Sequence, residues 1–149
     1  MITGRRRQAT CVAIGGRGVL IEGPPGAGKS GLALALIDRG AALVGDDGVA
    51  LERRGDALWA LPPPNTAGLI EARNLGLLRF PAVEAPVALR LVLDPGAPRF
   101  IEIAETGDIE GVAIPWLAFD PQIAPAAYRA ELALATHGLP QIPAARSRG

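Results

Sequence analysis

One short glycine-rich segment restricts what this chain can fold into more than any other. It consists of Gly23, Pro24, Pro25, Gly26, Ala27, Gly28, Lys29 and Ser30. An apolar run from Val19 to Ile21 precedes it, and apolar residues at helical spacing follow it as far as Gly40. In a strand, glycine-rich turn and helix of this order, backbone N–H groups and the positive end of the helix dipole surround phosphate oxygens. The segment therefore predicts a P-loop in an α/β fold.

Two residues at the end of the segment define its expected chemistry. Lys29 is the only lysine in the chain, because all the other basic residues are arginines. A flexible ammonium group suits phosphates that change geometry during transfer. We expect Lys29 to contact the β and γ phosphates of a nucleoside triphosphate and the Ser30 hydroxyl to ligate Mg²⁺. The alternative is a glycine-rich turn that caps an ordinary helix.

Asp46 and Asp47 are the best acidic candidates near the P-loop. They follow a short apolar run, residues 42–44, soon after the predicted helix. An acidic residue in this position can bind Mg²⁺ directly or through water. The second of the pair can accept a proton from a hydroxyl that attacks the γ phosphate, the general-base role found in kinases. An Asp-Asp-Gly turn between two strands is the alternative, and the residues alone leave both open.

The remaining pattern predicts a mixed sheet in one domain, residues 1–139. Two hairpins are expected, the first formed by 9–14 and 19–21 and the second by 49–52 and 57–61, with further strands at 42–44, 87–93, 100–104 and 112–114 and a last helix at 124–136. Residues 71–79 fit no single pattern, and residues 62–65 predict an irregular proline-rich loop. We expect a solvated arm at Arg5–Arg7 and a disordered tail at 140–149.

Composition limits the class of protein further. Basic and acidic residues balance at 15 each, so no net field draws the chain towards nucleic acid or an anionic membrane. No apolar run approaches the roughly 18 residues of a membrane span, and we expect a cytoplasmic protein. The single cysteine, Cys11, lies in an apolar run and is expected to be an inert buried thiol. The sequence contains no Cys/His cluster, so a zinc or iron site is not expected.

The stretch from Gly18 to Val49 resembles the catalytic domain of bacterial HPr kinase/phosphorylase. The order and spacing of the apolar strand, Gly-Lys-Ser, the Leu-Ala-Leu helix and the Asp46-Asp47 pair are similar to those of that family. Residues 71–76, EARNLG, are similar to its second signature. The family's N-terminal domain is absent from the sequence, which suggests a short form.

This resemblance implies a kinase that uses ATP and Mg²⁺ to phosphorylate a serine of HPr, the phosphocarrier of the sugar phosphotransferase system, and that can catalyse phosphorolysis of the phosphoserine. It implies that Ser30 and Glu71 hold the metal, that Asp47 is the base and Asp46 supports it, and that Arg99 is the catalytic arginine. It also implies a homo-oligomer, commonly a hexamer. The related fold is the nucleotide-binding core of phosphoenolpyruvate carboxykinase.

One departure from the family bears on the reaction. Gln8 stands where the family usually has a catalytic histidine, and a glutamine cannot exchange protons near neutral pH. Two alternatives to the HPr kinase are therefore kept: a nucleotide-sensing regulator without efficient phosphotransfer, which Gln8 motivates, and a small-molecule kinase.

Overall fold

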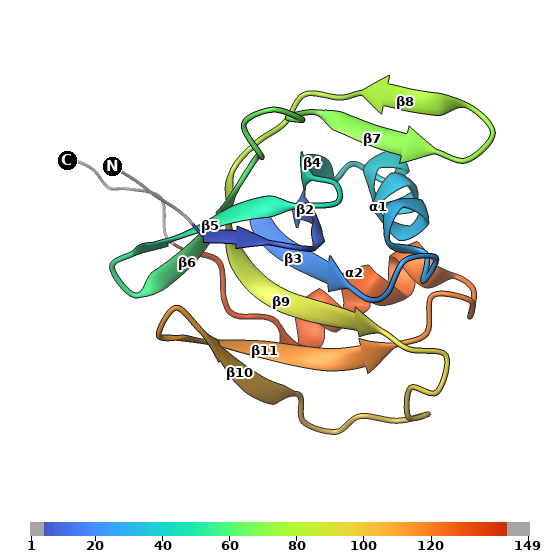
Figure 1. Cartoon of the computed structure of the whole chain (residues 1–149). Helices are drawn as coiled ribbons and strands as arrows, with labels where there is room; N and C mark the ends of the chain where they lie inside the picture. The colour runs from blue at the N-terminus through green and yellow to red at the C-terminus, as the bar shows by residue number, and fades with distance from the viewer. Residues whose placement is uncertain (1–4, 143–149) are drawn as a thin grey trace.

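The computed structural model describes residues 5–142 (Figure 1). In chain order its elements are β1 (Arg5–Arg7), β2 (Thr10–Ile14), β3 (Arg17–Glu22), α1 (Lys29–Asp38), β4 (Ala42–Gly45), β5 (Val49–Arg54), β6 (Ala57–Leu61), β7 (Leu69–Ala72), β8 (Gly76–Arg79), β9 (Ala85–Leu93), β10 (Glu105–Ile109), β11 (Val112–Phe119) and α2 (Ala126–His137). Among these residues no helix has the length and apolar character that crossing a membrane requires.

Most strands form one mixed sheet that curls around β9. The order is β1-β5-β6-β9-β3-β2-β4, and β11 pairs with β9 and carries β10 on its other edge. The start of β9 pairs antiparallel with β6, whereas its last residues pair in parallel with β11. Strands β6 and β11 pair with different ends of β9. The two hairpins β5–β6 and β10–β11 therefore diverge from β9 (Figure 1). Strands β3, β9 and β11 are parallel neighbours, so their carboxyl ends meet at one edge of the sheet.

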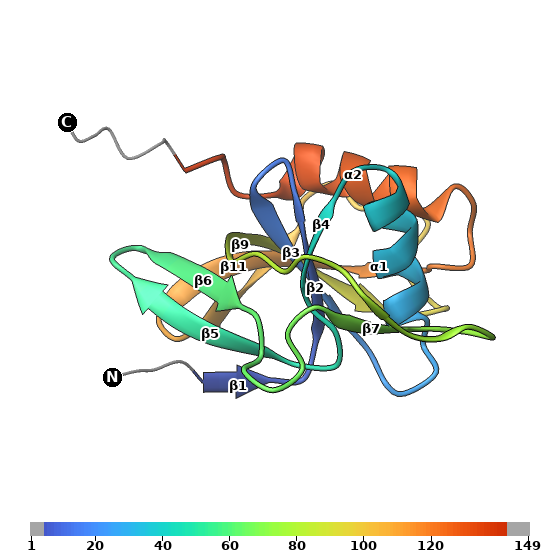
Figure 2. The same ribbon diagram turned by 90° about the horizontal axis from the view of Figure 1, so that it is seen from above.

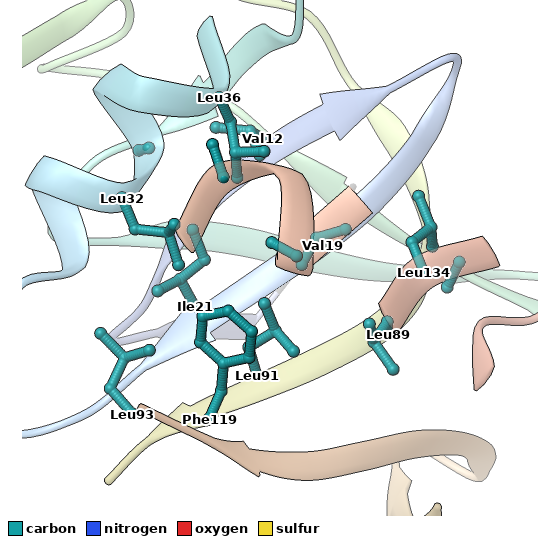
Figure 3. Packing of buried hydrophobic residues seen from close by; sticks show 14 of the residues in the cluster. Val12, Val19, Ile21, Leu32, Leu36, Leu89, Leu91, Leu93, Phe119 and Leu134 are labelled. Atoms are coloured by element: carbon teal, nitrogen blue, oxygen red, sulfur yellow. The ribbon is translucent and has the colours of Figure 1, made fainter. Parts of the chain in front are cut away.

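Both helices lie on the same face of this sheet (Figure 2). The cluster of side chains between helices and sheet includes Leu32 and Leu36 of α1, Leu134 of α2, and Ile21 and Leu91 from the strands (Figure 3). A second buried cluster lies on the other face, where the hairpin β5–β6 covers β2 and β3. The predicted phosphate loop, residues 23–30 and called the phosphate-loop segment or phosphate loop below, therefore follows a strand that is packed on both faces.

The structure confirms the mixed α/β class and most of the predicted elements. Both predicted hairpins form, with β2 pairing antiparallel with β3 and β5 with β6. Helix α1 ends as expected at Gly40, whose φ of 110° lets the N–H of Gly40 bond the carbonyl of Ile37. The ambiguous residues 71–79 belong to the hairpin β7–β8. The likeness to the phosphoenolpyruvate carboxykinase core remains a prediction.

Two predictions were wrong. Residues 100–104 form no strand: Phe100 and Ile103 are 78% and 81% exposed, and β10 begins only at Glu105. The three N-terminal arginines are not a free arm, since Arg5–Arg7 pair with Val49–Leu51 of β5. Of the tail predicted to be disordered, residues 143–149 lie outside the described part of the chain.

Candidate functional site

The phosphate-loop segment turns directly from the end of β3 into α1. Gly26 and Gly28 have φ angles of 84° and 104°, the left-handed region in which a side chain would strain the backbone. A Cβ added to Gly23 would lie only 3.0 Å from the Cβ of Ala27. Gly28 is the N-cap of α1 and makes no side-chain capping hydrogen bond. The first N–H groups of the helix and the helix dipole favour an anion at this turn.

Lys29 lies back across the turn that precedes it. Its Nζ donates hydrogen bonds to the carbonyl oxygens of Gly23 at 2.7 Å and Pro24 at 3.1 Å. The side chain is half-buried, whereas Pro24, Pro25 and Gly26 are exposed. The one lysine of the chain therefore holds its charge at the mouth of the loop, where phosphate oxygens would approach the backbone N–H groups.

Residues from three other segments contact the carboxylate of Asp46. Its Oδ1 accepts hydrogen bonds from the hydroxyls of Ser30, at 2.8 Å, and Thr10, at 2.9 Å. Its Oδ2 lies 3.4 Å from the backbone N–H of Glu71, which is a long hydrogen bond. Residues of β2, α1, the β4–β5 bend and β7 therefore meet beside the loop.

Asp47 has a different environment from its neighbour. It is exposed, and its φ of 64° is one of three positive values among the non-glycine residues of the described chain. The bend is tight, because a Cβ on Gly45 would lie 2.5 Å from the carbonyl oxygen of Gly48. Positive φ at an acidic residue beside a binding loop fits a functional position, since such conformations cost free energy. The Asp47 side chain is thus accessible from solvent, and its role as a base remains a prediction.

Glu71 lies on β7, in the hairpin that runs beside α1 (Figure 1). Its side chain is exposed, and its backbone N–H faces Asp46. No group of three or more His, Cys, Asp or Glu side chains suited to a metal is found within residues 5–142. Mg²⁺ bound with a nucleotide needs only one or two protein oxygens besides phosphate and water. The Ser30 hydroxyl and the Glu71 carboxylate are oxygen ligands of the right kind.

Arg99 is not among the residues that contact Asp46. It is exposed in the segment after β9 and lines a cavity of about 680 Å³ between this segment and α2. Asp120 lies on the border between that cavity and a smaller one beside the phosphate loop. The structure provides no hydrogen bond or ion pair between Arg99 and the other predicted site residues in the described part of the chain. Its catalytic role remains a prediction.

Comparison with known proteins relates the chain to one family. Residues 2–83, more than half of the 149, match the family model for the HPr serine kinase C-terminal domain. The chain belongs to this family. It is 41% identical over 85 residues to the HPr kinase/phosphorylase of Nitrosomonas europaea and 46% identical over 76 residues to that of Cupriavidus necator. These matches cover 56% and 50% of this chain but only 26% and 24% of the relatives.

The fold is also similar to a solved structure. The Hpr(Ser) kinase/phosphatase from Coxiella burnetii superposes with a TM-score of 0.76 at 27% sequence identity, covering 89% of this chain and 95% of that chain. The structural likeness therefore extends beyond the family-model match, into the part of the chain that holds β9, β11 and α2.

This member of the HPr serine kinase C-terminal domain family contains an ion triad that the sequence reading missed. Glu22 is the residue before the phosphate loop, and its carboxylate accepts hydrogen bonds from Arg7 of β1 and from Arg90 of β9. The side chains of Glu22 and Arg90 are only 12% and 17% exposed. Arg90 could have been noticed as a charge inside an apolar strand. Thr10, fully buried and bonded to Asp46, was the single polar residue in another apolar run.

Proposed function

We propose that this chain is an ATP- and Mg²⁺-dependent serine kinase that acts on HPr, and that it also catalyses phosphorolysis of the phosphoserine. The observation that carries the proposal is the convergence on Asp46 of Ser30, Thr10 and the Glu71 N–H beside the Lys29 loop. These residues come from four separate segments of the chain, and the chain belongs to a family whose named relatives are HPr kinases/phosphorylases.

In the forward reaction, Lys29 and the loop N–H groups would hold the triphosphate. The serine oxygen of the acceptor would form a bond to the γ phosphorus while the bond from that phosphorus to the β–γ bridging oxygen breaks, releasing ADP. Asp47 would take the hydroxyl proton and return it in the reverse direction. Ser30 and Glu71 would hold Mg²⁺, which neutralises charge on the phosphates.

A transfer assay tests this proposal directly. The protein is incubated with γ-labelled ATP, Mg²⁺ and HPr, and phosphoserine on HPr is the expected product. In the Asp47→Asn variant we expect transfer to fall at least about a hundredfold, because general-base catalysis contributes about 10²–10⁴. Binding of ATP should persist in this variant, since the exposed Asp47 side chain bonds none of the loop residues. ATP binding without any transfer by the unaltered protein would refute the kinase.

Gln8 supports a second candidate, a nucleotide sensor without efficient transfer. It is exposed, two residues before Thr10. A histidine there could exchange protons, whereas glutamine cannot. If the chain is a kinase with a weakened reverse reaction, Gln8→His should speed phosphorolysis of phosphorylated HPr about tenfold or more, with a smaller effect on the forward rate. A sensor would show no transfer in either direction with or without the histidine.

We further propose that the protein works in the cytoplasm, where HPr and ATP would be available, and that it assembles into a homo-oligomer, most simply a hexamer. Phe100 and Ile103, both strongly exposed on the segment before β10, support self-association, because neighbouring exposed apolar groups commonly mark interfaces. Sedimentation equilibrium should give six times the chain mass of 15.4 kDa, and a monomer across the micromolar range would contradict the assembly.

A further inference from the structure

A cavity of about 310 Å³ opens beside the phosphate loop, and none of the residues around Asp46 lines it. Its walls come from three turns: the loop itself, the turn at Asp94-Pro95 and the turn at Asp120-Pro121-Gln122. These turns follow the carboxyl ends of the three parallel neighbours β3, β9 and β11. Ligands of open α/β sheets bind at that edge of the sheet. The cavity therefore lies where a ligand held by the phosphate loop would extend.

Two carboxylates stand at the border of this cavity in fixed orientations. Oδ1 of Asp94 accepts the N–H of Gly96 at 2.8 Å, and Oδ1 of Asp120 accepts the N–H of Gln122 at 2.9 Å. In the described part of the chain neither Oδ2 receives a hydrogen bond. A pair of carboxylates repels phosphate but accepts hydrogen bonds from hydroxyl groups.

The turns that hold these carboxylates are braced. The N–H of Asp94 bonds the carbonyl oxygen of Phe119 at 2.9 Å, which ties the two turns together. Arg129 donates to the carbonyl oxygens of Asp120 and Ile123 and stacks on the Phe119 ring. Little ordering would be required on binding, so the site is preorganised.

Apart from the two carboxylates and Gln122, the side chains that line the cavity are apolar. They include those of Leu93, Pro24, Pro25, Pro95 and Pro121. A mainly apolar cavity with a few oriented polar groups, at the small end of the range of about 300–1,000 Å³, is typical of a small-molecule subsite. Its chemistry suits a flat ring next to a sugar with hydroxyl groups.

We infer that this cavity binds the nucleoside of the triphosphate, with the ribose hydroxyls donating to Asp94 and Asp120 and the base lying against the proline and leucine side chains. The inference rests on the proposed function, because the phosphate loop has to hold the triphosphate for the nucleoside to reach the cavity. In this arrangement the phosphate loop binds the triphosphate of ATP, and the cavity beside it binds the nucleoside.

Calorimetric titration distinguishes binding of the triphosphate from binding of the nucleoside. ATP, 2′,3′-dideoxy-ATP and tripolyphosphate are each titrated, with Mg²⁺, into the unaltered protein and into the double variant Asp94→Asn/Asp120→Asn. Asparagine keeps the side-chain oxygen that accepts the turn N–H and removes the charge. The control is Asp108→Asn, because Asp108 also accepts a turn N–H, that of Gly111 on the β10–β11 hairpin.

We expect the unaltered protein and the control to bind ATP about tenfold more tightly than dideoxy-ATP or tripolyphosphate. In the double variant the Kd for ATP should rise about tenfold, its preference over dideoxy-ATP should disappear, and the Kd for tripolyphosphate should stay the same or fall. Equal loss of affinity for ATP and tripolyphosphate, or an unchanged preference for ATP over dideoxy-ATP, would overturn the nucleoside site while leaving the phosphate loop intact. Failure of all three ligands to bind the unaltered protein would overturn the proposed function and this inference with it.

Discussion

At the scale of single residues, the adjacent Asp46 and Asp47 differ in what holds them. Asp46 accepts two hydroxyls and faces a backbone N–H, whereas Asp47 is exposed. Asp46→Asn removes the negative charge that strengthens these hydrogen bonds. It also replaces one carboxylate oxygen with an NH₂ group, which cannot accept a hydrogen bond from the donors that face it. We expect the free energy of unfolding to fall by about 1–3 kcal/mol, measured by urea denaturation. Asp47→Asn is the matched control and should stay within about 0.5 kcal/mol; equal losses for both would contradict the structural role of Asp46.

Cys11 gives a second prediction at this scale. The thiol is fully buried, and burial raises its pKa far above the usual value near 8.5, as expected for an inert core cysteine. Thiolate is the reactive form, so iodoacetamide at pH 8 should leave the folded protein unlabelled and should label it after unfolding in urea. Mass spectrometry reads the result without ambiguity, because the chain has no other cysteine. Labelling at similar rates in both states would show that β2 opens readily.

At the scale of elements, the triad of Arg7, Glu22 and Arg90 joins β1, β3 and β9 immediately before the phosphate loop. Glu22→Gln would leave two partly buried arginines without a counter-charge. We expect a loss of about 3 kcal/mol in the free energy of unfolding, because uncompensated buried charge is costly. Glu84→Gln breaks the exposed pair with Arg54 and should cost less than about 1 kcal/mol in the same urea titration. A loss at Glu22 no greater than that at Glu84 would mean that solvent screens the triad.

The elements also show how far sequence reasoning reaches. Hairpins with glycine turns and the strand-loop-helix unit were predictable, because local periodicity and turn residues determine them. The strand predicted at residues 100–104 failed because an apolar run forms a strand only where a partner edge is available, and Phe100 and Ile103 have none.

The residues of the candidate site, too, were only partly predictable from the sequence. The loop, Lys29 and the acidic pair follow from a local pattern, whereas Thr10 and the arginines around Glu22 depend on contacts between strands distant in sequence. The β1 pairing also brings Arg7 to Glu22, which a run of three arginines does not reveal. Spacing along the chain carries no information about such pairings.

At the scale of the whole molecule, β3 is one of several strands that contribute to both buried clusters. Val19 and Ile21 of β3 belong to the cluster beneath the helices, and Leu20 between them belongs to the cluster beneath β5–β6. Neither cluster can lose its packing without disturbing the strand that delivers the phosphate loop. The single domain predicted from the sequence should therefore unfold in one cooperative step.

This last prediction is tested with probes on two different strands. Trp59 lies on β6 and Trp116 on β11, so variants that keep one tryptophan each report on different parts of the molecule. Their fluorescence midpoints in urea should coincide with each other and with the loss of circular dichroism. Leu20→Ala, at a fully buried position, should lower all midpoints together by removing about 2–5 kcal/mol. A shift of the Trp59 transition alone would show instead that the β5–β6 side unfolds independently of the sheet that carries the phosphate loop.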